Sequence, residues 1–342
     1  MFKPKKYKTE GFSEYGMVWA EFFICGALLT FFAYNLCREG SIISDKTKID
    51  EGIIGIFFLA VATSFPEIVT AGTAVFSLGK IGLGYGDIIG SIIVNLMVLF
   101  GLDWYIGKGR ILSRVSGLTS LAGVFVVFIL FILLGAAVAR VRGVPIPSLG
   151  RMGIENILVA GGYIFYLFIA GRKNAGSKHE SIFKKCPDPF LSIWAKFAFF
   201  LIIVAFLSMW MAKVAEKIVE TTSLSQTFTG TLILGFTTSL PEIIVSFTAL
   251  RAASVDMAVG DIIGSNLFDT LIIPFLDALT EVPIAGMLSP GQIIATVLAF
   301  LLSCVAAAGM LIKKDTKYIV NWDTGLIFIG GFMSFVLLYF IK

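Results

Sequence analysis

Two short motifs place a carboxylate in the middle of an apolar stretch. Each has the pattern T-S-x-P-E, and they end in Glu67 and Glu242. An ionisable side chain at the centre of a membrane span costs ~2.5–3.5 kcal/mol on insertion scales, so a chain that carries one twice has a use for the charge. The proline before each glutamate lacks a backbone N–H and frees the carbonyl four residues earlier, at Ala62 or Thr237. We therefore expect two kinked helices, each offering oxygen ligands to a cation.

Further oxygen-bearing side chains accompany both glutamates. Inside the motifs they are Thr63, Ser64, Thr238 and Ser239. In the next apolar segment of each copy, polar residues recur every four residues and so line one helix face. These residues are Asp87, Ser91 and Asn95 in the first copy, and Asp261, Ser265 and Asp269 in the second. Such hard oxygens suit Ca²⁺, which takes about 6–8 of them, and Na⁺. The absence of paired His or Cys ligands argues against zinc or copper.

Each polar residue also has a plainer explanation. A single Ser or Thr in a membrane helix commonly bonds its own backbone, and Asn95 and Asp269 could instead join neighbouring helices. Asp87 and Asp261 follow a glycine where a helix is expected to begin, so an N-cap and a place on the ion's access path both fit them. Repetition at matched positions beside a glutamate favours an ion site for the group as a whole.

The elements that carry these motifs must be membrane helices. Of 342 residues, 57% are apolar and 15% are charged, and the mean hydropathy is +0.91. This composition excludes an ordinary soluble domain, and apolar runs long enough to span a bilayer recur along the chain. The fold class expected is an all-α polytopic membrane protein with ten transmembrane helices, over residues 16–37, 53–78, 84–107, 115–139, 152–171, 190–212, 229–250, 258–280, 289–312 and 324–341.

Charge outside the motifs suggests no further partner. The net charge of +4 is spread among the loops, so no nucleic acid is expected to bind. Asp103 and Glu155 fall near the ends of expected spans, where interfacial water would hydrate them. The partners expected are therefore the transported ions and the surrounding lipid.

The chain contains an internal repeat. Residues 55–102 and 230–276 share T-S-x-P-E followed by an identical hexapeptide, GDIIGS. An odd number of expected spans separates the copies, so the second enters the membrane from the opposite side. Inverted repeats of this kind place a binding site near the midplane, where the copies meet. We expect a first five-helix half over 1–171, a connecting loop over 172–189 and a second five-helix half over 190–342.

Loop charge indicates the orientation. With the N-terminus outside, the loops that face the cytoplasm carry more Lys and Arg than the outer ones, which fits the positive-inside rule, although the lysine-rich N-terminal tail then lies outside. The first apolar run is too long for a signal-peptide core and lacks a small-residue cleavage site, so we expect it to be retained. The location expected is the plasma membrane.

The motifs resemble those of a known family. TSFPE with GSIIVN, and TSLPE with GSNLFD, resemble the two α-repeats of the cation/Ca²⁺ exchanger superfamily, specifically its sodium/calcium exchanger branch. The likeness is sharp over the two repeats and extends to the whole chain through the expected five-plus-five layout. The chain departs from the usual pattern at Ala62, Phe65, Asp87 and Asp261.

The resemblance implies an activity and a set of ligands. Members of the family exchange several Na⁺ ions for one Ca²⁺, and their first and sixth spans slide across the remaining core to alternate access. The resemblance implies that the two glutamates bind Ca²⁺ and also serve Na⁺. The positions that match the family's ion ligands are Thr63, Ser64, Glu67, Ser91, Asn95, Thr238, Ser239, Glu242, Ser265 and Asp269.

Several alternatives stay open from the sequence. A Ca²⁺/H⁺ exchanger would exchange protons at the same glutamates, and a potassium-dependent Na⁺/Ca²⁺ exchanger has a similar G-S-N-x-F-D motif. A cation channel fits less well, because channels more often build their filters from symmetric subunits. An enzyme is not expected, since no nucleophile–base pair lies within the spans. No cofactor is expected, and a monomer suffices for the activity.

Overall fold

A computed structural model describes residues 10–47, 62–149, 152–174, 189–251, 255–280, 283–314, 316, 318 and 320–341. These residues are almost entirely helical. The first half contains α1 (Glu10–Thr47), α3 (Phe65–Gly72), the π-helix η1 (Thr73–Ser77), α4 (Ile81–Ile106), the 3₁₀ turn η2 (Ile111–Arg114), α5 (Gly117–Val141) and α6 (Ile154–Asn174). The second contains α7 (Phe190–Thr221), α8 (Gln226–Phe228), the π-helix η3 (Thr229–Leu234), α9 (Gly235–Thr238), α10 (Leu240–Arg251), α11 (Val255–Leu279), the 3₁₀ turn η4 (Ile284–Gly286), α12 (Pro290–Leu311) and α13 (Trp322–Phe340). Two short antiparallel strands, β1 (Ser148–Leu149) and β2 (Met152–Gly153), pair before α6.

The expected all-α polytopic class is confirmed. Among the described residues, eight helices are long and apolar enough to cross a membrane, and a bent pair, Gln226–Thr238 with Leu240–Arg251, makes a ninth candidate. Of the expected span over 53–78, the part before residue 62 lies outside the described residues, so the count of ten stays a prediction. The first and sixth expected spans are too short, because α1 continues to Thr47 and α7 to Thr221. Most of the loop expected over 172–189 also lies outside the description.

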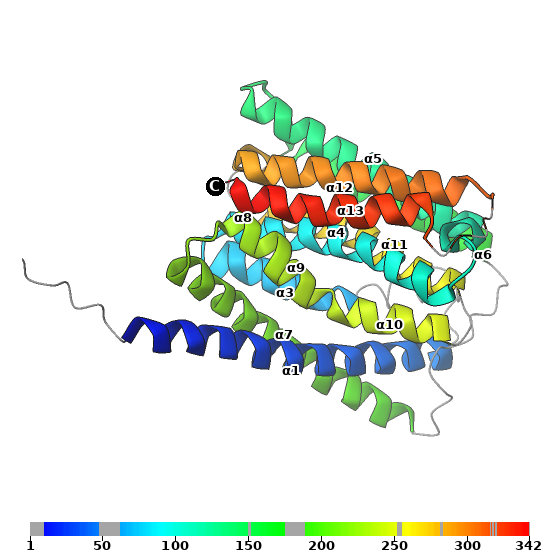
Figure 1. Ribbon diagram of the computed structural model, residues 1–342, viewed down its shortest axis with the longest axis horizontal. Coiled ribbons are helices and arrows are strands. Elements are labelled where there is room, and N and C mark those ends of the chain that lie inside the picture. The colour runs from blue at the N-terminus through cyan, green and yellow to red at the C-terminus, as the bar shows by residue number, and fades with distance from the viewer. Residues whose placement is uncertain are drawn as a thin grey trace, which may run out of the picture.

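The two halves pack with the same set of neighbours. Figure 1 shows α4 near the centre of a bundle of roughly parallel helices. Helix α4 contacts α12 and α13 of the second half, and its counterpart α11 contacts α5 and α6 of the first. Helices α4 and α11 also contact each other, as do α5 and α12. Exchanging the halves preserves these contacts, as the internal repeat predicts.

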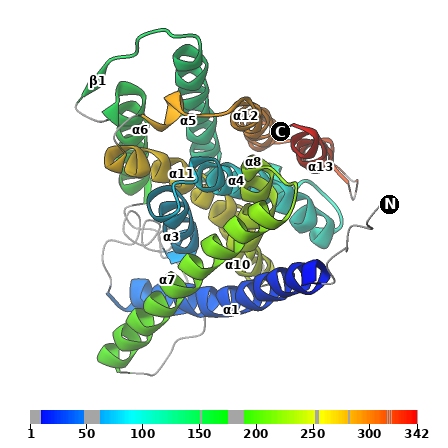
Figure 2. The same ribbon diagram turned by 90° about the vertical axis from the view of Figure 1, so that its left-hand side faces the viewer.

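Helices α1 and α7 form a layer of their own. They pack along each other on the opposite side of the bundle from α5, α12 and α13 (Figures 1 and 2). Helix α1 also contacts α10, and α7 contacts α3. Only 28% of the apolar window in α1 and 33% of that in α7 is buried inside the protein, against 89% in α4. The pair therefore covers the elements that carry the glutamates while exposing most of its own surface.

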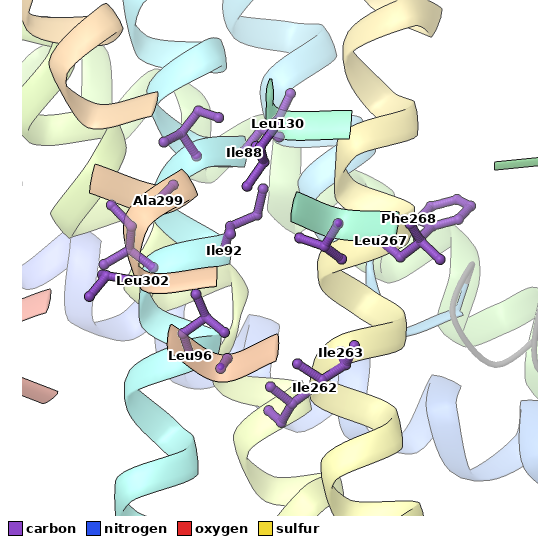
Figure 3. Close-up of a cluster of buried hydrophobic side chains, with 14 of the residues drawn as sticks. Ile88, Ile92, Leu96, Leu130, Ile262, Ile263, Leu267, Phe268, Ala299 and Leu302 are labelled. Carbon is purple, nitrogen blue, oxygen red and sulfur yellow. The ribbon is translucent and has the colours of Figure 1, made fainter. Parts of the chain in front are cut away.

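An apolar cluster fixes the central helices. Ile88, Ile92 and Leu96 recur every four residues on α4 and are buried (Figure 3). They pack with residues of three other helices, including Leu130, Ile262, Ile263, Leu267, Ala299 and Leu302. Because residues four apart share a helix face, α4 presents this apolar face beside the polar face of Asp87, Ser91 and Asn95. The packing thus sets the rotation of α4 about its axis.

Two aspartates hold the loops that follow α4 and α11 in place through hydrogen bonds. Asp103 Oδ1 accepts a hydrogen bond from the backbone N–H of Ile111 at 2.9 Å, and Asp277 Oδ1 accepts one from Ile284 at 2.6 Å. Asp103 Oδ2 also accepts from Thr324 Oγ1 at 2.7 Å. Asp103 and Asp277 are buried and stand at equivalent places in the two repeats. The expectation that Asp103 is hydrated at the interface is therefore wrong: backbone and hydroxyl donors replace water around it.

An ion pair anchors the first turn of the last helix in each half. Asp323 lies at the start of α13 and pairs with Arg110 of the first half: both are 1% exposed, and Arg110 Nη2 lies 2.5 Å from Asp323 Oδ2. Arg140 Nε donates to Glu155 Oε1, at the start of α6, at 2.8 Å. Glu155 is buried rather than hydrated, again contrary to expectation, because Arg140 compensates its charge.

Candidate functional site

Both T-S-x-P-E motifs interrupt a helix. Ser64 precedes α3 with φ −87° and ψ 14°, and Ser239 separates α9 from α10 with φ −83° and ψ 1°. The second interruption bends the span by 41°. Pro66 and Pro241 follow in the first turn of the new helix, where a missing N–H breaks no hydrogen bond. The predicted kink is confirmed at the second motif. At the first motif the helical backbone is interrupted at Ser64, but the span before residue 62 lies outside the described residues, so its bend stays a prediction. Each glutamate lies in the first turn of the helix that follows.

The two glutamates are buried and close to each other. Glu67 and Glu242 are each 1% exposed, and their carboxyl groups lie within direct electrostatic range of one another and of Asp269. Glu67 Oε2 and both carboxyl oxygens of Glu242 have no hydrogen-bond partner. Neither side chain faces lipid. The structure thus brings together the two acids that the sequence places far apart.

Hydroxyl pairs join each motif to the opposite repeat. Thr63 Oγ1 lies 3.3 Å from Ser265 Oγ, and Thr238 Oγ1 lies 3.2 Å from Ser91 Oγ. Thr63 and Thr238 are equivalent in the repeat, and so are Ser265 and Ser91. All four side chains are at most 1% exposed. The polar faces of α4 and α11 therefore meet the two kinks, as inverted packing predicts.

A second contact of α4 depends on the absence of side chains. Gly86 and Gly90 of α4 pack directly on Gly230 and Gly235 of η3 and α9, and we call these four residues the glycine contact. A Cβ added at Gly230 would lie 2.5 Å from a backbone oxygen of α4, and one added at Gly235 would lie 2.6 Å from the carbonyl carbon of Gly90. This close approach brings Ser91 Oγ to 3.5 Å from the Gly235 carbonyl oxygen.

The two aspartates of the GDIIGS sequences differ in their surroundings. Asp87 is fully buried, and its Oδ1 accepts from Thr238 Oγ1 at 3.0 Å. Asp261 is half-buried, and its Oδ2 accepts from Ser246 Oγ at 2.8 Å. Both lie inside helices, since α4 begins at Ile81 and α11 at Val255. The N-cap interpretation is wrong, because each helix begins earlier than the glycine suggested.

Buried oxygens without a partner gather around these groups. Buried polar groups in proteins are nearly always hydrogen-bonded, and each exception calls for an explanation. In this region the exceptions are Ser64 Oγ, Glu67 Oε2, Asp87 Oδ2, Asn95 Oδ1, Ser239 Oγ, and both carboxyl oxygens of Glu242 and Asp269. Asp269 faces Ser64 without forming a well-aligned hydrogen bond. These atoms are oxygens, the ligand type that Ca²⁺ and Na⁺ require.

The acids alone do not enclose a metal ion. Among the described residues, no group of three or more His, Cys, Asp or Glu side chains is arranged to hold one. A cation at this place must therefore also draw on the hydroxyl, amide and carbonyl oxygens around the acids.

Two residues near the site could not be identified as site residues from the sequence. Asn266 of α11 is fully buried and accepts from Asn95 Nδ2 at 3.0 Å. Its repeat equivalent is Ile92, so the repeat gave no signal for it. Cys37 of α1 is also fully buried and lies within electrostatic range of both glutamates. Helix α1 therefore forms one wall of the site.

A family model decides the identity of this arrangement. The model for sodium/calcium exchanger proteins matches residues 17–171 and 192–341, which include both repeats. The chain belongs to the sodium/calcium exchanger protein family. It is therefore an integral membrane protein of a cation/Ca²⁺ antiporter family, and the resemblance of its motifs is confirmed.

Relatives of this exchanger come from distant organisms. It is 26% identical to the uncharacterized membrane protein MJ0091 of Methanocaldococcus jannaschii, over 72% of this chain and 77% of the relative. It is also 26% identical to the putative antiporter CaxA of Alkalimonas amylolytica, over 72% and 75% of the two chains. Sodium/potassium/calcium exchanger 1 of Mus musculus is 34% identical, but over only 30% of this chain and 10% of the relative.

Solved structures share the fold of the exchanger. The H⁺/Ca²⁺ exchanger CAX matches with a TM-score of 0.70 and 11% identity, over 94% of this chain and 85% of that one. The sodium-calcium exchanger NCX_Mj matches with a TM-score of 0.60 and 21% identity, over 94% and 98%. At these identities the likeness establishes the fold, and neighbours that differ in the coupling ion are equally compatible with it.

Proposed function

We propose that this protein exchanges Na⁺ for Ca²⁺ across a membrane by alternating access at a site between the two repeats. The observation that carries the proposal is the pair of buried glutamates, flanked on both sides by hydroxyl pairs from opposite repeats. A proton needs only a carboxylate, whereas Na⁺ needs several neutral oxygens around it. The hydroxyl pairs and the Gly235 carbonyl supply such oxygens, which favours sodium over protons as the coupling ion.

The proposed ligands are the oxygen-bearing residues of both repeats. They are Thr63, Ser64, Glu67, Ser91 and Asn95, with Thr238, Ser239, Glu242, Ser265 and Asp269. Two ionised glutamates balance one Ca²⁺, and a set of Na⁺ ions can replace it. Unpaired carboxylates are costly away from water, so a loaded site can cross between faces more easily than an empty one. Because only the loaded site crosses easily, the ions are exchanged one set for the other rather than leaking through.

Asp87 and Asp261 fit a role on the ion's path. In this proposal the half-buried Asp261 lies on the more hydrated approach, and the buried Asp87 lies behind the glycine contact on the closed approach. We further propose that residues 1–171 and 190–342 are the two inverted halves joined by 172–189, that a monomer carries the activity, and that the N-terminus faces outward in the plasma membrane.

Transport in liposomes tests the coupling ion. Purified protein reconstituted with an outward Na⁺ gradient is expected to accumulate ⁴⁵Ca²⁺, and equal gradients of H⁺ or K⁺ alone are expected to drive no uptake. Protein-free liposomes give the background. Uptake that requires a pH gradient would identify the proton, not Na⁺, as the coupling ion. A requirement for K⁺ together with Na⁺ would indicate a potassium-dependent exchanger. Passive Ca²⁺ flux without exchange would indicate a channel.

Removing one hydroxyl is expected to weaken Na⁺ binding more than Ca²⁺ binding. Thr238→Val keeps the shape of the side chain but deletes an oxygen that faces Ser91. The half-saturating Na⁺ concentration for Na⁺-driven uptake should rise roughly fivefold, as expected for about one lost neutral interaction, while that for Ca²⁺ changes less than twofold. Thr248→Val is the matched control, because Thr248 lies six residues beyond Glu242 on α10 and its hydroxyl donates to its own backbone at Ile244.

Equal losses for both ions in Thr238→Val would contradict the assignment of this hydroxyl to sodium. Loss of Na⁺ affinity in Thr248→Val would show that the effect comes from the helix rather than from the site.

A further inference from the structure

The orientation of the Asn95 amide is set by a chain of hydrogen bonds that starts at a backbone carbonyl. Asn266 Nδ2 lies 3.4 Å from the carbonyl oxygen of Ile92, and Asn266 Oδ1 lies 3.0 Å from Asn95 Nδ2. Both asparagines are fully buried between α4 and α11. Each contact joins one helix directly to the other.

The direction of these two hydrogen bonds follows from which groups can donate and which can only accept. A carbonyl oxygen only accepts, so the end of the Asn266 amide that faces Ile92 must be the NH₂ group. The opposite end of Asn266 is then its oxygen, which faces Asn95. Asn95 must turn its own NH₂ group toward that oxygen, and its Oδ1 is left buried without a partner. The oxygen, which carries the negative end of the amide dipole, is thus the end that remains available to a ligand.

The equivalent positions of the two repeats differ in this hydrogen-bond arrangement. The residue equivalent to Asn95 in the second copy is Asp269, whose two carboxyl ends are both oxygens and need no orientation. The residue equivalent to Asn266 is Ile92, which contributes only its backbone. The orienting asparagine therefore occurs where the ligand has two different ends, and is missing where it has two identical ones.

We propose that Asn266 is a positioning residue that holds Asn95 Oδ1 toward the bound cation, and that Asn266 itself touches no ion. The proposal rests on the proposed function in taking Asn95 as a ligand. Without Asn266, the Asn95 amide is free to rotate and can turn its N–H groups toward the cation. The partial positive charge of these groups repels the cation.

Equilibrium Ca²⁺ binding to the purified protein tests this role. Binding of CaCl₂ measured by calorimetry does not depend on which ion drives transport, so a protein that proves to be proton-coupled still gives a valid answer. Asn266→Leu is expected to weaken Ca²⁺ binding roughly fivefold, the size of one neutral hydrogen bond. In an Asn95→Ala background the same change should alter binding less than twofold, because no amide remains to be oriented.

Two further variants separate positioning from packing. Asn266→Asp still offers an oxygen to Asn95 Nδ2, so its Ca²⁺ affinity should equal or exceed that of the unmodified protein. Asn156→Leu removes a different buried asparagine, at the start of α6, and should leave Ca²⁺ affinity unchanged. Equal weakening by Asn266→Leu with and without Asn95, unchanged binding in Asn266→Leu, or weakening in Asn266→Asp that matches Asn266→Leu would each overturn the proposal.

Discussion

Glu242→Gln is expected to abolish Ca²⁺ transport while leaving a folded protein. Glu242 is 1% exposed, and neither of its carboxyl oxygens has a partner in the protein. Two unit charges 4 Å apart attract by about 4 kcal/mol at an effective dielectric of 20. Losing one such attraction should lower Ca²⁺ affinity at least about 100-fold. Glutamine keeps the shape and removes only the charge, so packing around α10 should persist.

The measurement is Na⁺-driven ⁴⁵Ca²⁺ uptake in liposomes, with the thermal midpoint in detergent as the test of folding. Glu67→Gln should behave in the same way, because Glu67 is the repeat equivalent. Glu21→Gln is the matched control, since Glu21 is exposed and pairs with Lys217, and should retain full uptake. Normal transport by Glu242→Gln would remove the central ligand of the proposed site.

Gly90→Ala is expected to prevent α4 from packing against η3 and α9. A Cβ at Gly90 would lie 2.6 Å from the Cα of Thr231 and still closer to its carbonyl oxygen. Overpacking in a well-packed core commonly costs about 1–3 kcal/mol, and here the obstacle is backbone that cannot change rotamer. We expect a cost at or above the upper end, with loss of transport.

Gly264→Ala provides an internal comparison, because Gly264 is the repeat equivalent of Gly90. A Cβ there meets no atom within 4 Å among the described residues, and alanine favours a helix by ~1 kcal/mol over glycine. Thermal unfolding in detergent should therefore show a much lower midpoint for Gly90→Ala and an unchanged or higher one for Gly264→Ala. Equal midpoints for the two variants would mean that the glycine contact does not hold the bundle.

The membrane class and the kinks could be predicted from local sequence. Long apolar runs allow only helices to span a bilayer, and a proline two residues into a new helix marks where the old one ends. The meeting of Glu67 with Glu242 required one further step, the odd number of spans between the repeats. These features depend on periodicity and counting, which a single sequence contains.

The partners of buried polar groups could not be predicted in this way. Asp103 and Glu155 lie near span ends, where hydration and burial are equally compatible with the sequence. Their partners, Thr324 and Arg140, are set by tertiary packing. Asn266 has no polar equivalent in the first repeat, so symmetry could not identify it.

Differences between the two repeats could not be predicted from the sequence either. Asp87 and Asp261 occur in identical hexapeptides, yet one bonds Thr238 and the other Ser246. The position equivalent to Ser246 in the first copy is Ala71, so Asp87 has no serine of its own repeat to bond there. The partner of each aspartate therefore depends on tertiary packing rather than on the shared hexapeptide.

The exposed character of the α1–α7 layer has a consequence for movement. Phe23 and Phe31 on α1, and Phe199 and Phe206 on α7, are each more than half exposed, so hydrocarbon-like groups recur along the outer side of both helices. A shift by one helical turn, about 5.4 Å, would offer the acyl chains the same kind of surface as before. In the proposed exchange mechanism, the bilayer would therefore favour neither position of the two helices, and the ions bound between the repeats would decide which position they adopt.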